Sequence, residues 1–258
     1  MNLHGCGTIQ FAGMYDPVKD GVEKSIQAVS YAEAEPPSNL SELVHSYWQI
    51  KTDADLDEDF VLHALPDACT NLLFDQLDVS IAGVTALQTT HMALNLGKRF
   101  HFVGIQFYPG VWSDIAATVD HYVGEPYRGA LPLIETNRRL ASAEFVDKGP
   151  IFSQLVEQLW ADGLVMPNPV TARILSNLDE IHTVADMASV AGMSTRQLQR
   201  TLKETTGFSP HNLLKVLRVQ HSFRNDYQLA FADQSHFTHS FRKATGYTPG
   251  RFFKKFDV

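Results

Sequence analysis

The stretch at 183–210, TVADMASVAGMSTRQLQRTLKETTGFSP, constrains the fold of this chain more than any other part of the sequence. Thr183 and Asp186 have the three-residue spacing of a capping box, and so do Ser194 and Gln197. A glycine lies between the two signals, and glycine readily adopts the backbone conformations of tight turns. The spacing therefore predicts two short helices that meet at a turn.

The second of these helices has two different faces. Leu198 and Leu202 are four residues apart, so they fall on one side and predict a buried face. Cationic and amide side chains follow the other side: Arg196, Gln199, Arg200 and Lys203. Arg can donate two hydrogen bonds to guanine, Gln can pair with adenine, and Lys contacts phosphate. Most charged stripes are solvated surface, but within a helix-turn-helix this one predicts contact with DNA.

Part of this stretch is repeated 39 residues further along the chain. LKETTGFSP at 202–210 recurs as FRKATGYTP at 241–249. The repeat aligns two glycines and two Ser/Thr-Pro pairs, which are typical of the end of one helix and the start of the next. The sequence therefore predicts a second reading helix, whose outer face is less cationic than that of the first.

Two runs, GMSTRQLQRTLKETTGFSP and ADQSHFTHSFRKATGYTPGRF, carry a resemblance to a known family. With them, residues 172–256 resemble the DNA-binding domain of the AraC/XylS family of bacterial transcription regulators. The resemblance implies two helix-turn-helix units, whose helices at 194–206 and 233–245 enter successive major grooves about 34 Å apart. It also implies DNA contacts from Arg196, Gln199, Arg200 and Lys203 in the first unit, and from Gln234, Ser235, Thr238 and His239 in the second.

The second unit departs from the family pattern. Its linker helix is predicted from Pro210 to about Phe223, and only residues 224–230 then precede FADQSHF, where the family has roughly ten more residues. Either the first helix of this unit is absent, or it is fused to the end of the linker helix. The second unit is then distorted, or the sequence lacks a natural segment. His239 weakens the unit further, because His is mostly neutral at pH 7.

The middle of the chain has the alternating pattern of short strands. Six segments, SYWQI, FVLHAL, NLLF, VSIAG, HMALNL and RFHFVGIQF, are separated by turn residues and predict an antiparallel barrel or sandwich. The runs FVLHALPDACTNLLFD and VGIQFYPGVWSDIAA are similar to the cupin-like sensor domain of many AraC-type regulators, over residues 40–127. This resemblance implies either a small-molecule effector in a barrel or a dimerisation surface. Aromatic residues such as Trp48 and Phe102 are expected in the core, although a ligand pocket uses the same residue types.

Catalytic and cofactor-binding patterns do not occur in this region of the sequence. His63, His91 and His101 form no His-x-His pair of the kind that binds metal on a strand, so each is expected to be an isolated structural residue. Asp67 lies at a predicted turn, and Cys69 has no cationic neighbour to activate it. A Gly-rich phosphate loop and a nucleophile elbow are also missing from the sequence. We therefore expect neither an enzyme nor a metal nor a cofactor.

These patterns predict an α+β multidomain chain with four segments. They are an N-terminal arm at 1–38, a cupin-like antiparallel β-barrel sensor domain at 39–128, a helical connector at 129–167 and an all-α double helix-turn-helix domain at 168–258. The connector contains two amphipathic helices between Pro132 and Gly163, which either pair two subunits in a homodimer or pack on their own barrel. MPNP at 166–169 is expected to be the hinge into the DNA-binding domain.

Charge is divided unevenly along the chain. The net charge is −8, but residues 168–258 hold 12 Lys and Arg against 7 Asp and Glu. The rest of the chain holds 9 against 22. A basic module on an acidic body is typical of a protein that contacts DNA phosphates locally.

The sequence therefore predicts a one-component transcription regulator. Two cysteines and the lack of a signal-like or membrane-spanning apolar run predict a reduced, cytoplasmic protein. Its expected partners are double-stranded DNA, a small-molecule effector, a second copy of the chain in a homodimer, and RNA polymerase if it is an activator. The alternative is a ligand-binding or protein-interaction module whose incomplete second helix-turn-helix does not support specific DNA binding.

Overall fold

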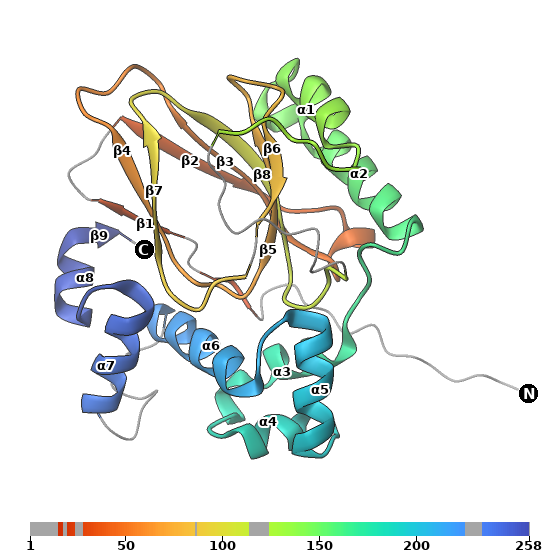
Figure 1. Cartoon of the computed structure of the whole chain (residues 1–258), viewed down its shortest axis with the longest axis vertical. Helices are drawn as coiled ribbons and strands as arrows, with labels where there is room; N and C mark the ends of the chain where they lie inside the picture. The colour runs from red at the N-terminus through yellow and green to blue at the C-terminus, as the bar shows by residue number, and fades with distance from the viewer. Residues whose placement is uncertain are drawn as a thin grey trace, which may run out of the picture.

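Antiparallel β-sheets form the N-terminal part of the chain and helices form its C-terminal part (Figure 1). The computed structural model describes residues 15–17, 20–23, 28–85, 87–113, 124–224 and 234–257. The change from strands to helices follows the change in hydrophobic period along the sequence. The predicted α+β class is therefore confirmed.

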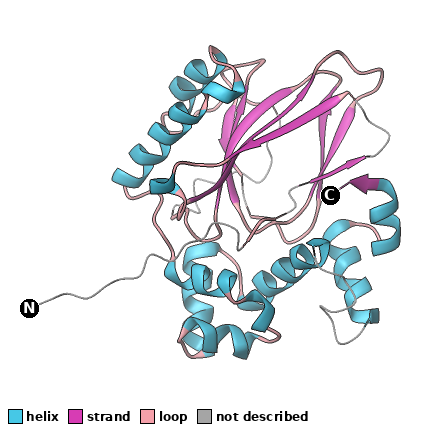
Figure 2. Ribbon diagram, turned by 180° about the vertical axis from the view of Figure 1, so that it is seen from behind, coloured by secondary structure: helices cyan, strands magenta, loops and turns pink. Residues whose placement is uncertain are grey.

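Two sheets are formed by the described strands, and all neighbouring strands within them are antiparallel. The five-stranded sheet has the order β2 (Val29–Ala34), β3 (Val44–Thr52), β8 (His101–Phe107), β5 (Thr70–Asp75) and β6 (Ala82–Val84). The four-stranded sheet has the order β7 (Met92–Gly97), β4 (Phe60–Ala64), β1 (Asp20–Glu23) and β9 (Phe256–Asp257). The two sheets lie on opposite sides of the β-region (Figure 2).

All six strands predicted from alternation are present, as β3 to β8. The prediction of a closed barrel is corrected, because the edge strands β2 and β6 pair with none of the described strands of the other sheet. Residues 1–14, 18–19 and 24–27 of the predicted arm lie outside the described residues, and its described part contributes β1 and β2. Strands as short as β1 and β9 show too few alternations to be recognised from sequence.

The two predicted connector helices are α1 (Leu133–Ala141) and α2 (Gly149–Ala161). Both pack on the five-stranded sheet of their own chain, where Tyr47 stacks on Phe152 with ring centroids 4.9 Å apart. The buried Asn137 amide donates to the carbonyl of Ile81 at 3.0 Å. Lys148, whose pKa is lowered by burial, donates to the carbonyl of Ala143 at 2.6 Å. The apolar stripe of α2 is therefore used within one chain and gives no support to the predicted homodimer.

Six α-helices follow the connector in the described part of the chain. They are α3 (Pro169–Ser176), α4 (Val184–Ala191), α5 (Thr195–Thr206), α6 (Pro210–Arg224), α7 (Gln234–Thr245) and α8 (Pro249–Lys255). The short 3-10 helices η1 (Ser38–Leu40), η3 (Phe145–Asp147) and η4 (Leu178–Glu180) lie in the described connections. None of the helices that the structure describes combines the length and the hydrophobicity needed to cross a bilayer.

The start of α3 is fastened to the turn that follows β8. Asn168 caps α3 by accepting from the backbone nitrogen of Thr171 at 3.2 Å, and its amide donates to the carbonyl of Gly110 at 3.1 Å. Gly110 has a φ of 78°, and a Cβ there would lie 2.6 Å from the Asn168 amide nitrogen. Glycine is therefore required where the backbone at residue 110 approaches the Asn168 side chain. The same hydrogen bond ties the segment 166–169, which was predicted as a hinge, to the sheet region. One hydrophobic core accordingly runs from the five-stranded sheet through α2 into the helices α3 to α6.

Candidate nucleic-acid interface and ligand cavity

Helices α4 and α5 begin with the two capping boxes that the sequence predicts. Thr183 Oγ1 accepts from the Asp186 backbone nitrogen at 3.1 Å, and Asp186 Oδ2 accepts from the Thr183 nitrogen at 2.7 Å. Hydrogen bonding to Thr183 and its neighbour lowers the pKa of the Asp186 carboxyl. Ser194 and Gln197 exchange the same two bonds, at 3.0 and 3.3 Å. Gly192, with a φ of 68°, makes the turn between the helices, so the two predicted short helices and the turn between them are present at this place.

Helix α5 presents one buried face and one exposed face. Leu198 and Leu202 are buried in the large core. The four residues predicted to contact DNA from this unit are all exposed: Arg196, Gln199, Arg200 and Lys203. Arg200 lies 4.0 Å from Glu204 in an ion pair so exposed that it contributes little energy. Lys203 Nζ donates to the carbonyl of Gly207 at 2.8 Å, and it therefore also caps the helix.

Helix α7 has the bounds of α5 shifted by 39 residues, as the repeat predicts. Ser235 and His239 are exposed and Thr238 is half-buried, while Gln234 is the first residue of the helix. His239 and Lys243 line a groove of about 280 Å³ together with Lys215 of α6. Residues 225–233, on which the prediction of a lost or fused helix rests, lie outside the described residues.

The C-terminal end of α7 is held by the four-stranded sheet. The last carbonyls of a helix have no partner within the helix, and two of them here accept from His63 of β4 and from His91, which directly precedes β7. His63 Nε2 donates to the carbonyl of Thr245 at 2.6 Å, and the backbone nitrogen of His91 donates to the carbonyl of Ala244 at 2.6 Å. Strand β9 then pairs with β1, so the end of the chain becomes part of the sheet (Figure 1). The last helical unit is therefore attached to the sheet region at several points.

Of the three histidines that were predicted to be isolated, two lie next to each other and the third does not. The rings of His63 and His91 lie 4.7 Å apart, and both contact the C-terminal unit. His101 Nε2 lies 2.9 Å from Gln49 Oε1 within the other sheet. Across the residues that the structure describes, no group of three or more His, Cys, Asp or Glu is arranged to hold a metal ion.

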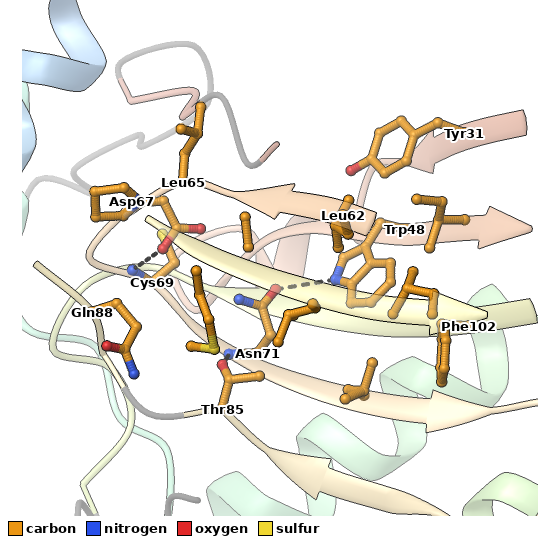
Figure 3. A pocket seen from close by; sticks show the side chains of 17 residues that line it. Tyr31, Trp48, Leu62, Leu65, Asp67, Cys69, Asn71, Thr85, Gln88 and Phe102 are labelled. Carbon is orange, nitrogen blue, oxygen red and sulfur yellow. Dashed lines mark hydrogen bonds between the residues drawn. The ribbon is translucent and has the colours of Figure 1, made fainter. Parts of the chain in front are cut away.

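A cavity of about 170 Å³ lies between the two sheets (Figure 3). Side chains of both sheets line it, and most of them are apolar: Trp48, Ile50, Leu62, Leu73, Met92, Leu94, Leu96 and Phe102 are examples. Trp48 and Phe102, which were expected in the core, pack against the core cluster of Ile50, Phe60 and Phe100 and also form part of the wall of this cavity. Most of its polar side chains, those of Asn71, Thr85, Gln88 and Asp67, lie toward one end, whereas Tyr31 lies at the other end.

Hydrogen bonds fix the polar end of the cavity. Asp67 accepts from Gln106 Nε2 at 2.6 Å and from the backbone nitrogen of Cys69 at 2.9 Å, as expected for an aspartate at a turn. Asn71 Oδ1 accepts from Trp48 Nε1 at 3.1 Å. Cys69 is buried, as predicted.

Of the polar residues of the cavity, the sequence patterns singled out Asp67 but not Asn71, Thr85 or Gln88. Alternation along β5 could have placed Asn71 on the same face as Leu73. Thr85 and Gln88 lie beyond β6, where no periodic pattern indicates which way a side chain points. The tertiary structure alone brings these three side chains together.

Strand β4 is a wall shared by the cavity and the C-terminal unit. Leu62 and Ala64 line the cavity, whereas His63 between them faces α7, because neighbouring side chains in a strand point to opposite faces. Leu65 lines the cavity and also packs in the cluster that contains Phe237 and Phe241 of α7. A movement of the cavity wall would therefore reach α7 directly, through Leu65 and His63.

Comparisons with known proteins give limited matches. A family model described as a domain of unknown function (DUF6597) matches residues 32–119, which lie in the sheet region. No curated protein matches the chain. The crystal structure of ToxT from Vibrio cholerae O395 is 11% identical, covers 90% of this chain and 100% of that chain, and has a TM-score of 0.41. The crystal structure of unsaturated fatty acid bound wild-type ToxT from Vibrio cholerae strain SCE256 is 10% identical, covers 93% of this chain and 97% of that chain, and has a TM-score of 0.40. Values this low do not establish a shared fold or function.

Proposed function

We propose that this chain is a DNA-binding transcription regulator that binds double-stranded DNA mainly through α5. One observation carries the proposal: exposed cationic and amide side chains follow a single face of a helix whose start is capped and whose other face is buried. In this proposal the C-terminal helices work like those of the AraC/XylS-type regulators that their sequence resembles.

Each side chain of the stripe has a distinct role in the proposal. Arg196 and Arg200 donate to guanine or to phosphate, and Gln199 pairs with adenine. Lys203 contacts phosphate as a point charge. Arg196, Gln199 and Arg200 lie in the first two turns of α5, which is the part of a recognition helix that reaches base edges, whereas Lys203 lies in its last turn. A helix held by a capping box and a packed face presents these groups with little loss of entropy on binding.

The second unit contributes less in this proposal. Gln234, Ser235, Thr238 and His239 of α7 include no permanent cation, whereas three of the four residues of the first unit are cationic. Positive charge near these residues comes from Arg242 and Lys243 in the last turn of α7 and from Lys215 of α6 in the neighbouring groove. We therefore expect the second unit to add phosphate contacts and modest specificity.

We also propose that a small molecule bound between the sheets controls the second unit. The support is the shared wall: Leu65 contacts both the cavity and the phenylalanine cluster of α7. A ligand that moves β4 also moves the His63 side chain that holds the end of α7. The homodimer and the contact with RNA polymerase remain predictions in this proposal.

The test is a mobility shift with DNA from upstream of the chain's own coding region, at several salt concentrations. The variant with both Arg196→Ala and Arg200→Ala should bind at least ten times more weakly, with a salt slope lower by about 2, because two phosphate or base contacts are lost. The matched control changes Arg138 and Arg139 of α1 to Ala, which removes the same charge from an exposed helix outside the proposed interface. The control should bind like the wild type.

Two outcomes would contradict the proposal. Equal binding by the Arg196/Arg200 variant and the wild type would show that α5 does not contact DNA. Binding that is independent of sequence and is lost near physiological salt would favour the alternative, a ligand-binding or protein-interaction module without specific DNA binding.

A further inference from the structure

The cavity between the sheets differs from an ordinary packing defect because it has a polar end. Protein interiors are close-packed, and an apolar cavity of about 150 Å³ is already large enough to hold benzene. The cavity here measures about 170 Å³, and Trp48 and Phe102 form flat parts of its wall. Its size and walls fit a molecule with a single ring and one short substituent.

Unused hydrogen-bond donors lie at the polar end. In the part of the chain that the structure describes, the side-chain amides of Asn71 and Gln88 donate to no protein group, although Asn71 does accept from Trp48. Thr85 Oγ1 accepts from the backbone nitrogen of Asn71 at 2.9 Å, which leaves its hydroxyl proton for another acceptor. These donors converge beside an otherwise apolar space (Figure 3). A ligand that supplies an acceptor there would complete these bonds.

The charges around the cavity exclude one class of ligand. No Lys or Arg is found among the lining residues in the described ranges, and the charged side chain that does line the cavity is the Asp67 carboxylate. An anion bound here would be unpaired in an apolar environment and close to a like charge, which is strongly unfavourable. Asp67 already accepts from Gln106 and from Cys69, so it is not arranged primarily to receive a cation.

We infer that the cavity between the two sheets binds a neutral, single-ring organic molecule with a hydrogen-bond acceptor directed at Asn71, Thr85 and Gln88. Such a molecule is the class of effector that the proposed function requires. The inference rests on the proposed function only for the effect of the ligand on the second helical unit. The binding itself is measured without DNA, so its failure is distinct from a failure of DNA binding.

The experiment is calorimetric titration of the full chain with three matched probes. Acetophenone has the ring and a carbonyl acceptor, ethylbenzene lacks the acceptor, and benzoate replaces the neutral group by an anion. Acetophenone should bind at least about tenfold tighter than benzoate, because the anion lacks a partner in the cavity. Acetophenone should also bind tighter than ethylbenzene, by the factor of about 2–12 that corresponds to one net hydrogen bond.

Two substitutions at Gln88 test whether the ligand binds in this cavity. Gln88→Leu should weaken the binding of acetophenone by about the same factor of 2–12, because only a hydrogen bond is removed. The affinity for ethylbenzene should stay within about twofold of the wild-type value. Gln88→Lys adds the missing cation and should make benzoate the tighter ligand of the two. Circular dichroism checks that both variants fold.

Clear results would overturn the inference. Benzoate binding to the wild type as tightly as acetophenone would show that the cavity does not select against anions. Lack of binding by acetophenone and ethylbenzene would show that a single-ring molecule does not enter it. Unchanged acetophenone binding by both Gln88 variants would place the ligand elsewhere on the protein.

Discussion

The two helical units of the C-terminal region share a plan but differ in what stabilises them. Helices α5 and α7 have equivalent bounds, and each ends at a glycine with positive φ, Gly207 at 71° and Gly246 at 79°. The same bond also recurs near each end: Thr206 Oγ1 donates to the carbonyl of Leu202 at 2.6 Å, and its repeat mate Thr245 donates to that of Phe241 at 2.9 Å. The repeat in the sequence is thus a repeat of local structure.

The surroundings of the two helices are different. The first unit has α4 as a companion, two capping boxes and the large core of the chain. The second has a separate phenylalanine cluster that is completed by Leu65 from the sheet region, and its last carbonyls are bound by His63 and His91. The comparison teaches that the first unit is held by its own caps and by the core that it shares with the five-stranded sheet, whereas the second is held by a separate cluster and by hydrogen bonds from His63 and His91.

The largest effect expected from this difference comes from Leu65→Ala. Leu65 is buried in the cluster of the second unit, and such a truncation costs about 2–5 kcal/mol in the free energy of unfolding. Amide hydrogen exchange should show lower protection in α7 and unchanged protection in α5. The matched control, Leu198→Ala, should lower protection in α5 first. If Leu65→Ala lowered protection equally in both helices, the two units would not differ in their dependence on the cluster that contains Leu65.

A smaller effect is expected from His63→Phe, which keeps an aromatic ring but removes the donor to the Thr245 carbonyl. An unsatisfied buried acceptor costs about 1–3 kcal/mol, so the C-terminal turn of α7 should exchange its amides faster. His101→Phe is the control, because His101 lies in the other sheet and is bound to Gln49. Unchanged exchange in α7 of the His63 variant would show that this bond does not hold the second unit.

The smallest effect is expected from the side chains that precede α6 and α8. Ser209 Oγ accepts from the Asn212 backbone nitrogen at 3.2 Å, whereas the Thr248 side chain makes no cap hydrogen bond. Ser209→Ala should therefore cost about 1 kcal/mol in denaturant unfolding. Thr248→Ala, the equivalent change in the repeat, should cost only a few tenths of a kcal/mol, because no bond is lost. Equal costs would mean that the two caps are equivalent in solution.

Local signals in the sequence were sufficient for much of the fold. The capping pairs at Thr183 and Ser194 predicted the starts of α4 and α5, because cap bonds join residues only three positions apart. Alternation predicted six strands, and helical spacing predicted α1 and α2. The exposed stripe of α5 was predicted for the same reason, since one helix determines which of its side chains share a face.

Long-range pairing could not be read in this way. Alternation shows which face of a strand is buried, but not which strands become neighbours, so the strand order of the two sheets and the use of residues 256–257 as a strand were not foreseen. The same limit applies to the cavity, because Asn71, Thr85 and Gln88 come from different segments and converge only in the folded chain.

The sequence by itself determined the repeated helical unit, its caps and the cationic face of α5, because all of these depend on contacts between residues close together in the chain. Only the tertiary structure decided that α7 ends on the four-stranded sheet and that β4 is shared with a cavity. Those features join residues far apart in sequence, such as His63 and Thr245, and no local pattern encodes the pairing of such distant groups.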